Sequence, residues 1–245
     1  NPPWETFQPD AKEFFAEYSD LVTKKKMDIK EFQKELKRLL RDPEIMEAWL
    51  AYHSRFNHQR NFFRFAHQYE NQVPIIDGKR HGKDVNLFKL FLEQSFHLLR
   101  VGGQCGIVIP SGIYTDLGAK SLREKLFSTT QIEGLFCFEN RKEIFENVHR
   151  SFKFIVLTFQ QGGQTKEFPA AFMRHDLSDL TRFPQEGALQ IKVELLKRLS
   201  PDSFSVMEFK SERDIEIAEK MLAQPLLGDD AAKGWRLELH REFNM

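Results

Sequence analysis

Residues 104–110, QCGIVIP, form a short apolar run that ends at Pro110 and has the length of one buried strand. Two further apolar runs follow, IEGLFCF at 132–138 and FKFIVLTFQ at 152–160. Between the first two lies a helical pattern of about three turns, LGAKSLREKLFST at 117–129. Strands that alternate with helices in this way predict half of an α/β domain with helices packed on a sheet.

Helical patterns precede this region. The segment KDVNLFKLFLEQSFHLL at 83–99 is amphipathic, and its inward residues are predicted to be Leu87, Leu90, Phe91 and Leu98. Within 5–75, MDIKEFQKELKRLL at 27–40 has apolar residues at three- to four-residue spacing. A longer helix begins after Asp42, the expected N-cap residue, with Pro43 in its first position. We expect two or three helices packed as a hairpin.

The pattern weakens after residue 161. Residues 161–188 have turn signals and little periodicity, whereas 189–199 (LQIKVELLKRL) and 212–224 (ERDIEIAEKMLAQ) are predicted to be amphipathic helices. The stretch GWRLELHREFNM at 234–245 is compatible with a strand or with an approach to a further domain. This change of pattern predicts a domain boundary near residue 161.

Composition restricts the classes of partner. Lys and Arg total 36, as do Asp and Glu, so the formal net charge is zero. A freestanding nucleic-acid-binding module is usually basic, so any contact with a polyanion must come from a local patch or from another part of a larger protein. Cys105 and Cys137 lie in apolar runs, which indicates buried thiols in a reducing compartment and no metal site. We expect a cytoplasmic protein with no membrane span and no signal peptide.

Four stretches in order resemble the N6-adenine DNA methyltransferases, above all the large type IIG and related restriction–modification enzymes. They are NPPW at 1–4, VNLFKLFLEQSFHLLRVGGQCGIVIPS at 85–111, LREKLFSTTQIEGLFCFEN at 122–140 and IFENVHRSFKFIVLTF at 144–159. NPPW alone recurs by chance, whereas four elements in the right order are far more specific. Residues 172–180, 199–222 and 241–245 are similar to the family's connector towards its target-recognition domain.

This resemblance implies the C-terminal half of a Rossmann-like methyltransferase fold that uses S-adenosylmethionine (SAM). The three apolar runs would be the last three of seven strands, with the final one antiparallel. The implied segments are a catalytic loop at 1–4, a helical insertion at 5–75, the second half of the core at 76–160 and a helical connector at 161–245. We expect the glycine-rich SAM motif to lie upstream of Asn1 and the target-recognition domain beyond Met245. The edge of the QCGIVIP strand would then be unprotected in this chain.

The resemblance makes the Asn-Pro-Pro-aromatic tetrapeptide the catalytic motif. The lone pair of an adenine N6 amine is delocalised into the ring, and two acceptors on its N–H bonds localise it for attack on a methyl group. The Asn1 side-chain oxygen and the Pro2 carbonyl are the predicted acceptors, and Pro2 and Pro3 stiffen the loop. Trp4 is predicted to stack on a base flipped out of double-stranded DNA.

Further site residues are implied on both sides of the reaction. Phe145 would provide the second aromatic contact with the base, and Asn86 and Phe88 would lie near the adenine of SAM. The cations Lys142, Arg150 and Lys153 would contact the DNA backbone. Each has a structural alternative, namely a core position under the loop for Phe145, helix capping or packing for Asn86 and Phe88, and ordinary surface charge for the cations.

Two other functions stay open on the sequence alone. Enzymes that methylate a protein glutamine amide also use Asn-Pro-Pro-aromatic, although the insertion and the connector argue against this substrate. Alternatively, the chain is a non-catalytic structural or interaction fragment. Because most of the SAM site would lie outside this chain, we expect the isolated chain to be inactive and to bind SAM weakly or not at all.

Overall fold

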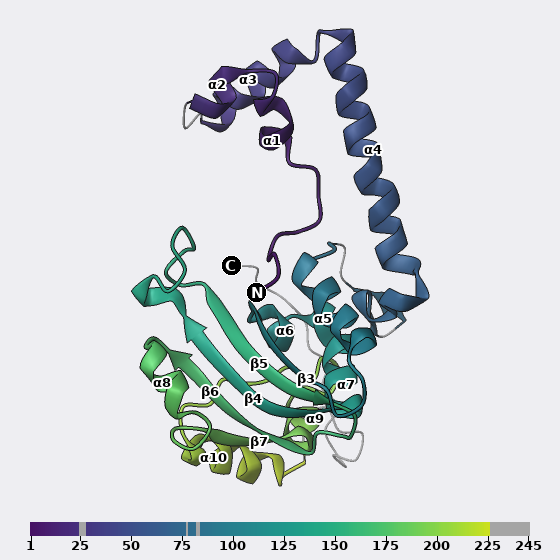
Figure 1. Ribbon diagram of the computed structural model, residues 1–245. Coiled ribbons are helices and arrows are strands. Elements are labelled where there is room, and N and C mark those ends of the chain that lie inside the picture. Colours follow the sequence, from purple (N-terminus) through teal and green to yellow (C-terminus); the bar gives the residue numbers. More distant parts are fainter. Residues whose placement is uncertain (25–27, 77, 82–83, 226–245) are drawn as a thin grey trace. The chain divides into compact units, whose positions relative to one another are not determined.

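The computed structural model describes residues 1–24, 28–76, 78–81 and 84–225 (Figure 1). The chain divides into two compact units. One unit is Pro2–Leu98, and the other comprises Asn1 and the chain from Leu99 onward. The stretch at 234–245, with its predicted strand or domain approach, lies outside the described residues.

The unit Pro2–Leu98 is mainly helical. Its described elements are α1 (Ala11–Ala16), α2 (Asp20–Lys24), α3 (Ile29–Leu39), α4 (Pro43–Phe65), the 3₁₀ helix η1 (His67–Gln72), the short strands β1 (Ile75–Ile76) and β2 (Lys79–Arg80), and α5 (Leu87–Leu98). The two predicted helices of 27–65 are confirmed as α3 and α4. Asp42 caps α4 by accepting the Glu44 N–H at 2.9 Å, and Pro43 is its first residue.

Aromatic side chains join α1 to α4. The buried Phe15 ring lies 5.0 Å from the Trp49 ring, and the Phe14 ring lies 4.9 Å from that of Tyr52. Such ring pairs add to the hydrophobic free energy of burial. Phe14 and Phe15 therefore pack α1 against α4 within the helical unit.

Helix α5 is confirmed, but its predicted inward face is wrong in part. Phe91 and Leu98 are 51% and 76% exposed. The polar residue Glu93 is instead fully buried, where it accepts hydrogen bonds from the backbone and side chain of Asn71 and from the Gln72 amide. These bonds join α5 to η1. The apolar residues on the buried face of α5 are Phe88, Leu90, Leu92 and Phe96.

The second unit is built on a five-stranded mixed sheet, which confirms the predicted α/β fold. Its strands are β3 (Gln104–Pro110), β4 (Thr130–Glu139), β5 (Lys153–Gln161), β6 (Glu167–Arg174) and β7 (Leu189–Lys192), in the spatial order β3-β5-β4-β6-β7. β5 is antiparallel to both β3 and β4, as expected for the last of the three predicted strands. β4 and β6 are parallel, and β7 is antiparallel to β6.

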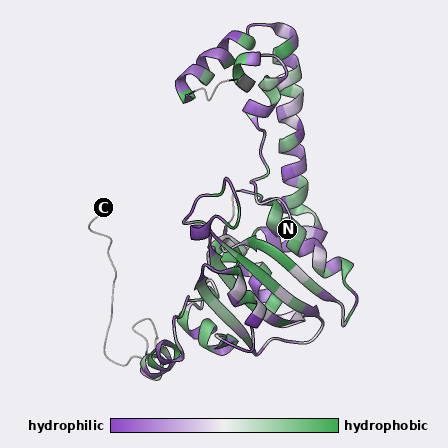
Figure 2. Ribbon diagram, turned by 60° about the vertical axis from the view of Figure 1, so that its left-hand side comes forward, coloured by the Kyte–Doolittle hydropathy of each residue, from purple (hydrophilic) through white to green (hydrophobic). Residues whose placement is uncertain are grey.

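Helices and short turns connect these strands. They are α6 (Gly112–Thr115), the 3₁₀ turns η2 (Leu117–Ala119) and η3 (Asn140–Lys142), α7 (Lys120–Thr129), α8 (Leu177–Arg182), α9 (Val193–Leu199) and α10 (Glu212–Leu222). The strands are mostly hydrophobic in Figure 2, and Ile109, Ile155 and Phe159 are fully buried. The core of the unit therefore lies along β3, β4 and β5.

The sheet continues past residue 161, which the sequence did not predict. Residues 167–174 form β6, and the predicted helix over 189–199 begins as strand β7 before α9 starts at Val193. β7 is held by its pairing with β6, in which Phe168 lies opposite Ile191 and both side chains are buried. Tertiary pairing overrides the helical periodicity of these four residues.

Arg123 of α7 is a buried cation that binds two segments together. Its guanidinium donates to the Ile113 carbonyl at 2.8 Å and to the Ser203 carbonyl at 2.7 and 3.1 Å. Burial lowers the pKa of Arg123 to about 10, so the group is still charged at neutral pH. The segment after α9 is thereby fixed beside α6, where Val206 N–H also donates to the Tyr114 carbonyl.

We predict that Arg123→Met lowers the free energy of unfolding by about 2–3 kcal/mol, because the buried Ile113 carbonyl and the part-buried Ser203 carbonyl lose their donors. Urea unfolding followed by circular dichroism measures this change. The control Arg213→Met, at an exposed position of α10, should change stability by less than about 0.5 kcal/mol. Equal stability of the two variants would contradict the assignment.

A carboxylate of the helical unit makes stability depend on pH. Glu35 is buried and accepts two hydrogen bonds from Arg38, at 2.7 and 2.9 Å, and one from Ser19 at 2.8 Å. The Arg38 bonds, followed by the Ser19 bond, lower the pKa of Glu35 from 4.5 to about 2. Because the folded state lowers this pKa, the stabilisation is complete above pH 4.5 and is lost as the pH falls towards 2.

We therefore predict that Glu35→Gln removes part of the loss of stability between pH 5 and pH 2. Urea unfolding at several pH values, followed by the fluorescence of Trp49 and the other tryptophans, tests this. Glu47→Gln, at an exposed position of α4, is the control and should keep the pH dependence of the unaltered chain. The prediction is wrong if the two variants show the same pH dependence.

Candidate functional site

The carboxyl ends of β3, β4 and β6 lie at the same end of the sheet, because these strands run in one direction. The antiparallel β5 begins at that end. In open α/β sheets, ligands bind outside the carboxyl ends of the parallel strands. Helix α6, the loop at 140–152 and the segment after β6 all start here and form the candidate site of this unit.

One buried side chain shapes the loop at 140–152. Asn140 is fully buried, and its amide nitrogen donates to the carbonyls of Phe145 and Val148, each at 2.9 Å. Its amide oxygen accepts the Phe145 N–H at 2.9 Å, and its own N–H donates to the Phe152 carbonyl. Asn147 lies within the loop at a positive φ of 63°, a conformation in which asparagine is enriched. Asn140 therefore holds both sides of the loop.

Phe145 is placed by this network. Its backbone is bound to Asn140, and its half-buried ring meets the buried Phe154 ring edge-on at 4.8 Å. Phe154 in turn stacks on Phe138 of β4 at 5.3 Å. One part of the ring therefore packs on the core, and the rest is exposed. This position is compatible both with the predicted contact with a base and with a packing role.

The predicted backbone-contact cations all have carboxylate partners. Lys142 pairs with Asp176, Arg150 with Glu143 and Lys153 with Glu208. A DNA phosphate would have to displace a carboxylate at each of them. A backbone contact by these residues stays a prediction.

Lys153 belongs to a chain of polar contacts that the sequence did not predict. Its ammonium donates to Glu208 at 2.6 Å, and the Tyr114 hydroxyl donates to the other oxygen of Glu208 at 2.7 Å. The same hydroxyl lies 3.1 Å from Cys137 Sγ. Burial raises the pKa of Tyr114 and that of Cys137, and the Glu208 bond raises the pKa of Lys153.

At neutral pH the contacts around Glu208 stabilise the fold. The Cys137 thiol and the Tyr114 hydroxyl are neutral, and the ion pair between Lys153 and Glu208 joins the start of β5 to the segment after α9. Glu208 lies 55 residues from Lys153 and 94 from Tyr114, so no local pattern could have revealed it. Both cysteines are free, and Cys137 is buried as predicted, whereas Cys105 is only half-buried.

A second polar group lies where β4 and β6 end. Glu139 accepts from Arg141 at 2.9 Å and lies 3.2 Å from His175 Nε2. The Arg141 bond, followed by the His175 contact, lowers the pKa of Glu139. Among the residues that the structure describes, no group of His, Cys, Asp or Glu is arranged to hold a metal ion.

The segment that follows NPPW is fixed within the helical unit. Phe7 N–H donates to the Val85 carbonyl at 2.7 Å, and Leu87 N–H donates to the Glu5 carbonyl at 3.0 Å. Between them the Thr6 hydroxyl donates to the Asn86 side-chain oxygen at 3.2 Å. The structure therefore holds the residues after Trp4 against the start of α5.

The predicted cofactor residues have different surroundings. Asn86 is half-buried with its amide oriented by Thr6, while Phe88 is buried, which favours the packing alternative for its ring. Within the motif, Asn1 and Pro3 are exposed, and Pro2 and Trp4 are half-buried. Asn1, Phe145 and the three cations belong to the unit with the sheet, whereas Pro2–Trp4, Asn86 and Phe88 belong to the helical unit.

A hollow of about 720 Å³ lies next to this segment within the helical unit. Aromatic rings of Phe7, Tyr52 and Phe56 line it together with the carboxylates of Glu5, Asp10 and Glu13. The Phe7 and Phe56 rings are 4.9 Å apart. The sequence did not indicate this hollow, because the parts of the chain that line it, 5–13, 52–56 and Leu87, lie far apart in the sequence.

Residues 68–145 match the Eco57I restriction-modification methylase family. This match confirms the predicted resemblance to restriction–modification methyltransferases over that segment. It includes Asn86, Phe88, Lys142 and Phe145, and it extends from η1 into the loop after β4.

Parts of the chain are similar to solved structures. A type I restriction-modification methyltransferase subunit from Streptococcus thermophilus is 15% identical with a TM-score of 0.43, covering 58% of this chain and 33% of that one. The type IIG restriction endonuclease BpuSI is 21% identical with a TM-score of 0.40, covering 60% of this chain and 19% of that one. The chain thus spans at most about a third of either protein. Comparison with curated proteins found no match.

None of the described helices combines the length and the apolar character needed to cross a membrane.

We predict that Asn140→Ala loosens the loop at 140–152 and lowers the free energy of unfolding by about 1–3 kcal/mol, because three part-buried backbone groups lose their partner. Hydrogen–deuterium exchange of the loop amides should accelerate. Asn147→Gly is the matched control, since glycine adopts positive φ without cost, and it should leave exchange nearly unchanged. Unaltered exchange in Asn140→Ala would refute the role of this side chain.

Proposed function

We propose that this chain forms part of a SAM-dependent DNA methyltransferase of a restriction–modification system, acting on the N6 amine of adenine. The observation that carries the proposal is the match of residues 68–145 to the restriction-modification methylase family, downstream of the motif NPPW. In support, the residues directly after the motif are hydrogen-bonded to the segment 85–87 inside the matched region.

The chemistry assigned to the motif is hydrogen bonding that favours the transition state. The Asn1 side-chain oxygen and the Pro2 carbonyl accept the two N–H groups of the amine, so that its lone pair is localised on nitrogen. Acceptors that fit the pyramidal nitrogen better than the planar one lower the barrier. The surrounding chain contributes mainly by positioning the amine for in-line attack.

The target base must leave the duplex, which costs a few kcal/mol. Stacking on an aromatic ring returns about 1–3 kcal/mol for each base. Trp4 is the proposed platform, and its half-buried position leaves surface for a base. Phe145 is the proposed second contact, supported by its partly exposed ring and its fixed backbone.

SAM is the proposed cofactor and supplies the methyl group. Asn86 is the residue of this chain best suited to contact it, because Thr6 orients its amide beside the segment that follows the motif. Phe88 would contribute through its backbone, since its ring is buried. We infer that the rest of the SAM site and the target-recognition domain lie in other parts of a complete cytoplasmic enzyme, and that the isolated chain is inactive.

The test uses the complete polypeptide that contains this chain, with labelled SAM and either duplex DNA or a glutamine-containing protein. We predict label in the adenine N6 of DNA. Asn1→Ala and Trp4→Ala should each reduce the rate by at least about 10²-fold while SAM binding is retained. Asn61→Ala, at an exposed position of α4, is the control.

Full activity of Asn1→Ala would exclude the catalytic assignment. Label in the glutamine substrate alone would favour a protein methyltransferase, the second candidate that shares the Asn-Pro-Pro-aromatic motif. Absence of label from both substrates would favour a structural or interaction role.

A further inference from the structure

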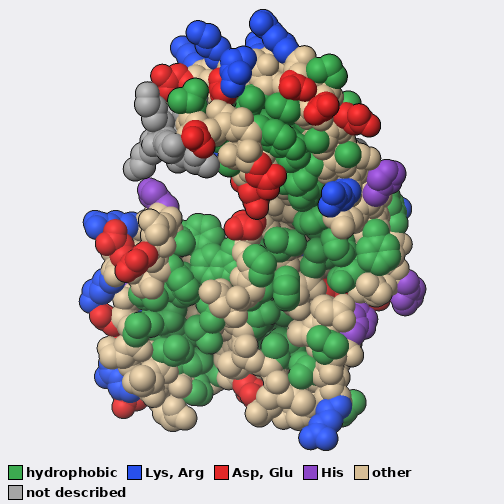
Figure 3. All heavy atoms as spheres, turned by 45° about the horizontal axis from the view of Figure 1, so that its top comes forward, with side chains coloured by type: hydrophobic (Ala, Val, Ile, Leu, Met, Phe, Trp, Pro, Cys, Tyr) green, Lys and Arg blue, Asp and Glu red, His purple; other side chains and the backbone are tan. Residues whose placement is uncertain are grey.

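Helix α3 presents a row of exposed cations. Lys30, Lys34 and Lys37 follow one another at spacings of four and three residues, which places them on one face of the helix. Arg41 continues the row just past the end of α3. In Figure 3, Lys and Arg side chains gather over the helices at the top of the view. We call these four residues the α3 stripe.

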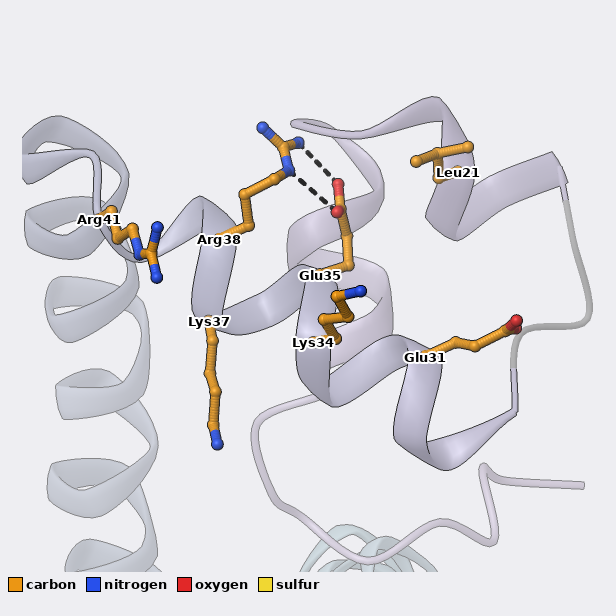
Figure 4. A pocket seen from close by; sticks show the side chains of 7 residues that line it. All are labelled: Leu21, Glu31, Lys34, Glu35, Lys37, Arg38 and Arg41. Atoms are coloured by element: carbon orange, nitrogen blue, oxygen red, sulfur yellow. Dashed lines mark hydrogen bonds and ion pairs between the residues drawn. The ribbon is translucent and has the colours of Figure 1, made fainter.

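A hollow of about 530 Å³ opens beside the stripe. Figure 4 shows Lys34, Lys37 and Arg41 around it, with Arg38 joined to Glu35. Glu31 is the second carboxylate of its lining, and it lies in the first turn of α3, where the helix dipole favours a negative charge. The lining therefore has more cationic than anionic groups.

The carboxylates of this hollow do not neutralise the stripe. Glu35 is bound by Arg38 through two hydrogen bonds and by Ser19 through a third. Within the part of the chain that the structure describes, Lys30, Lys34, Lys37 and Arg41 have no ion pair. In this they differ from Lys142, Arg150 and Lys153, each of which is paired with a carboxylate.

The dimensions of the stripe suit a nucleic-acid backbone. Lys30 and Lys37 are seven positions apart, which corresponds to about 10 Å of helix, and Arg41 lies beyond the end of α3. A major groove is about 12 Å wide. The stripe is therefore long enough to reach phosphates on both sides of one groove.

We propose that the α3 stripe binds the phosphate backbone of duplex DNA and so makes the helical unit a sequence-independent DNA contact. This inference rests on the proposed function for its choice of polyanion. Ammonium groups on flexible stems bind phosphates as point charges without reading sequence. The formal charge of the whole chain is zero, so its affinity for DNA must come from such a local row.

The test compares this chain with K30A/K34A/K37A in binding a fluorescein-labelled duplex of arbitrary sequence, followed by anisotropy at several salt concentrations. We expect the triple variant to bind at least about 10-fold more weakly at low salt. The slope of log K against log salt should become shallower by roughly 2–3, because each lost phosphate contact removes about 0.9.

Two controls isolate the effect of position. K197A/R213A/K220A removes the same charge from exposed sites on α9 and α10 and should bind DNA within about 2-fold of the unaltered chain. K30R/K34R/K37R keeps the charge and should retain both affinity and slope. Thermal melting by circular dichroism checks that all variants are folded.

The proposal is overturned if the unaltered chain does not bind duplex DNA at low salt, or if the stripe variant binds it as the α9–α10 control does. It is also overturned if the stripe variant loses only binding to poly-L-glutamate, the probe for an acidic protein partner. Methylation by the complete polypeptide is measured in parallel. If the stripe variant loses DNA affinity and the unaltered complete polypeptide does not methylate, the stripe is supported and the proposed function is contradicted. If the stripe variant keeps both DNA affinity and methylation, the stripe alone is contradicted.

Discussion

Strand β5 runs antiparallel between β3 and β4, and its hydrogen bonds with both neighbours constrain the rest of the sheet unit. A parallel strand would have required a long crossover to the opposite end of the sheet. The antiparallel direction instead makes the chain turn back where β4 ends. The loop at 140–152 must therefore stand at the carboxyl ends of β3 and β4, and Lys153 enters the sheet close to Tyr114 and Glu208.

The sequence was sufficient where burial is continuous and insufficient where pairing is distant. QCGIVIP, IEGLFCF and FKFIVLTFQ became β3, β4 and β5 because each is a short, mostly apolar run of strand length. β6 was missed because Pro169 interrupts an otherwise apolar run, and β7 because its four residues continue into a helix of the same composition.

The candidate site divides in the same way. A motif such as NPPW is visible in the sequence, and so is the aromatic residue of the following loop. The partner of Lys153 is not visible in the sequence. Glu208 is distant along the chain, and its segment is held in place by the hydrogen bonds of Arg123 in α7 to the Ser203 carbonyl. The net charge of the chain also conceals how its cations are distributed. A zero total hides the difference between the sheet unit, where the candidate cations are paired, and α3, where the cations of the stripe stand in a row.

Asn140 has a consequence for how the loop tolerates change. Its side chain binds main-chain groups of Phe145 and Val148 and makes no demand on their side chains. Asn140 therefore fixes the backbone of the loop without a hydrogen bond to the side chains of Phe145 and Val148. Glu143 and Asn147 are constrained by their positive φ, but substitutions at the other exposed positions of 141–150 can change what the loop contacts while the turn is kept.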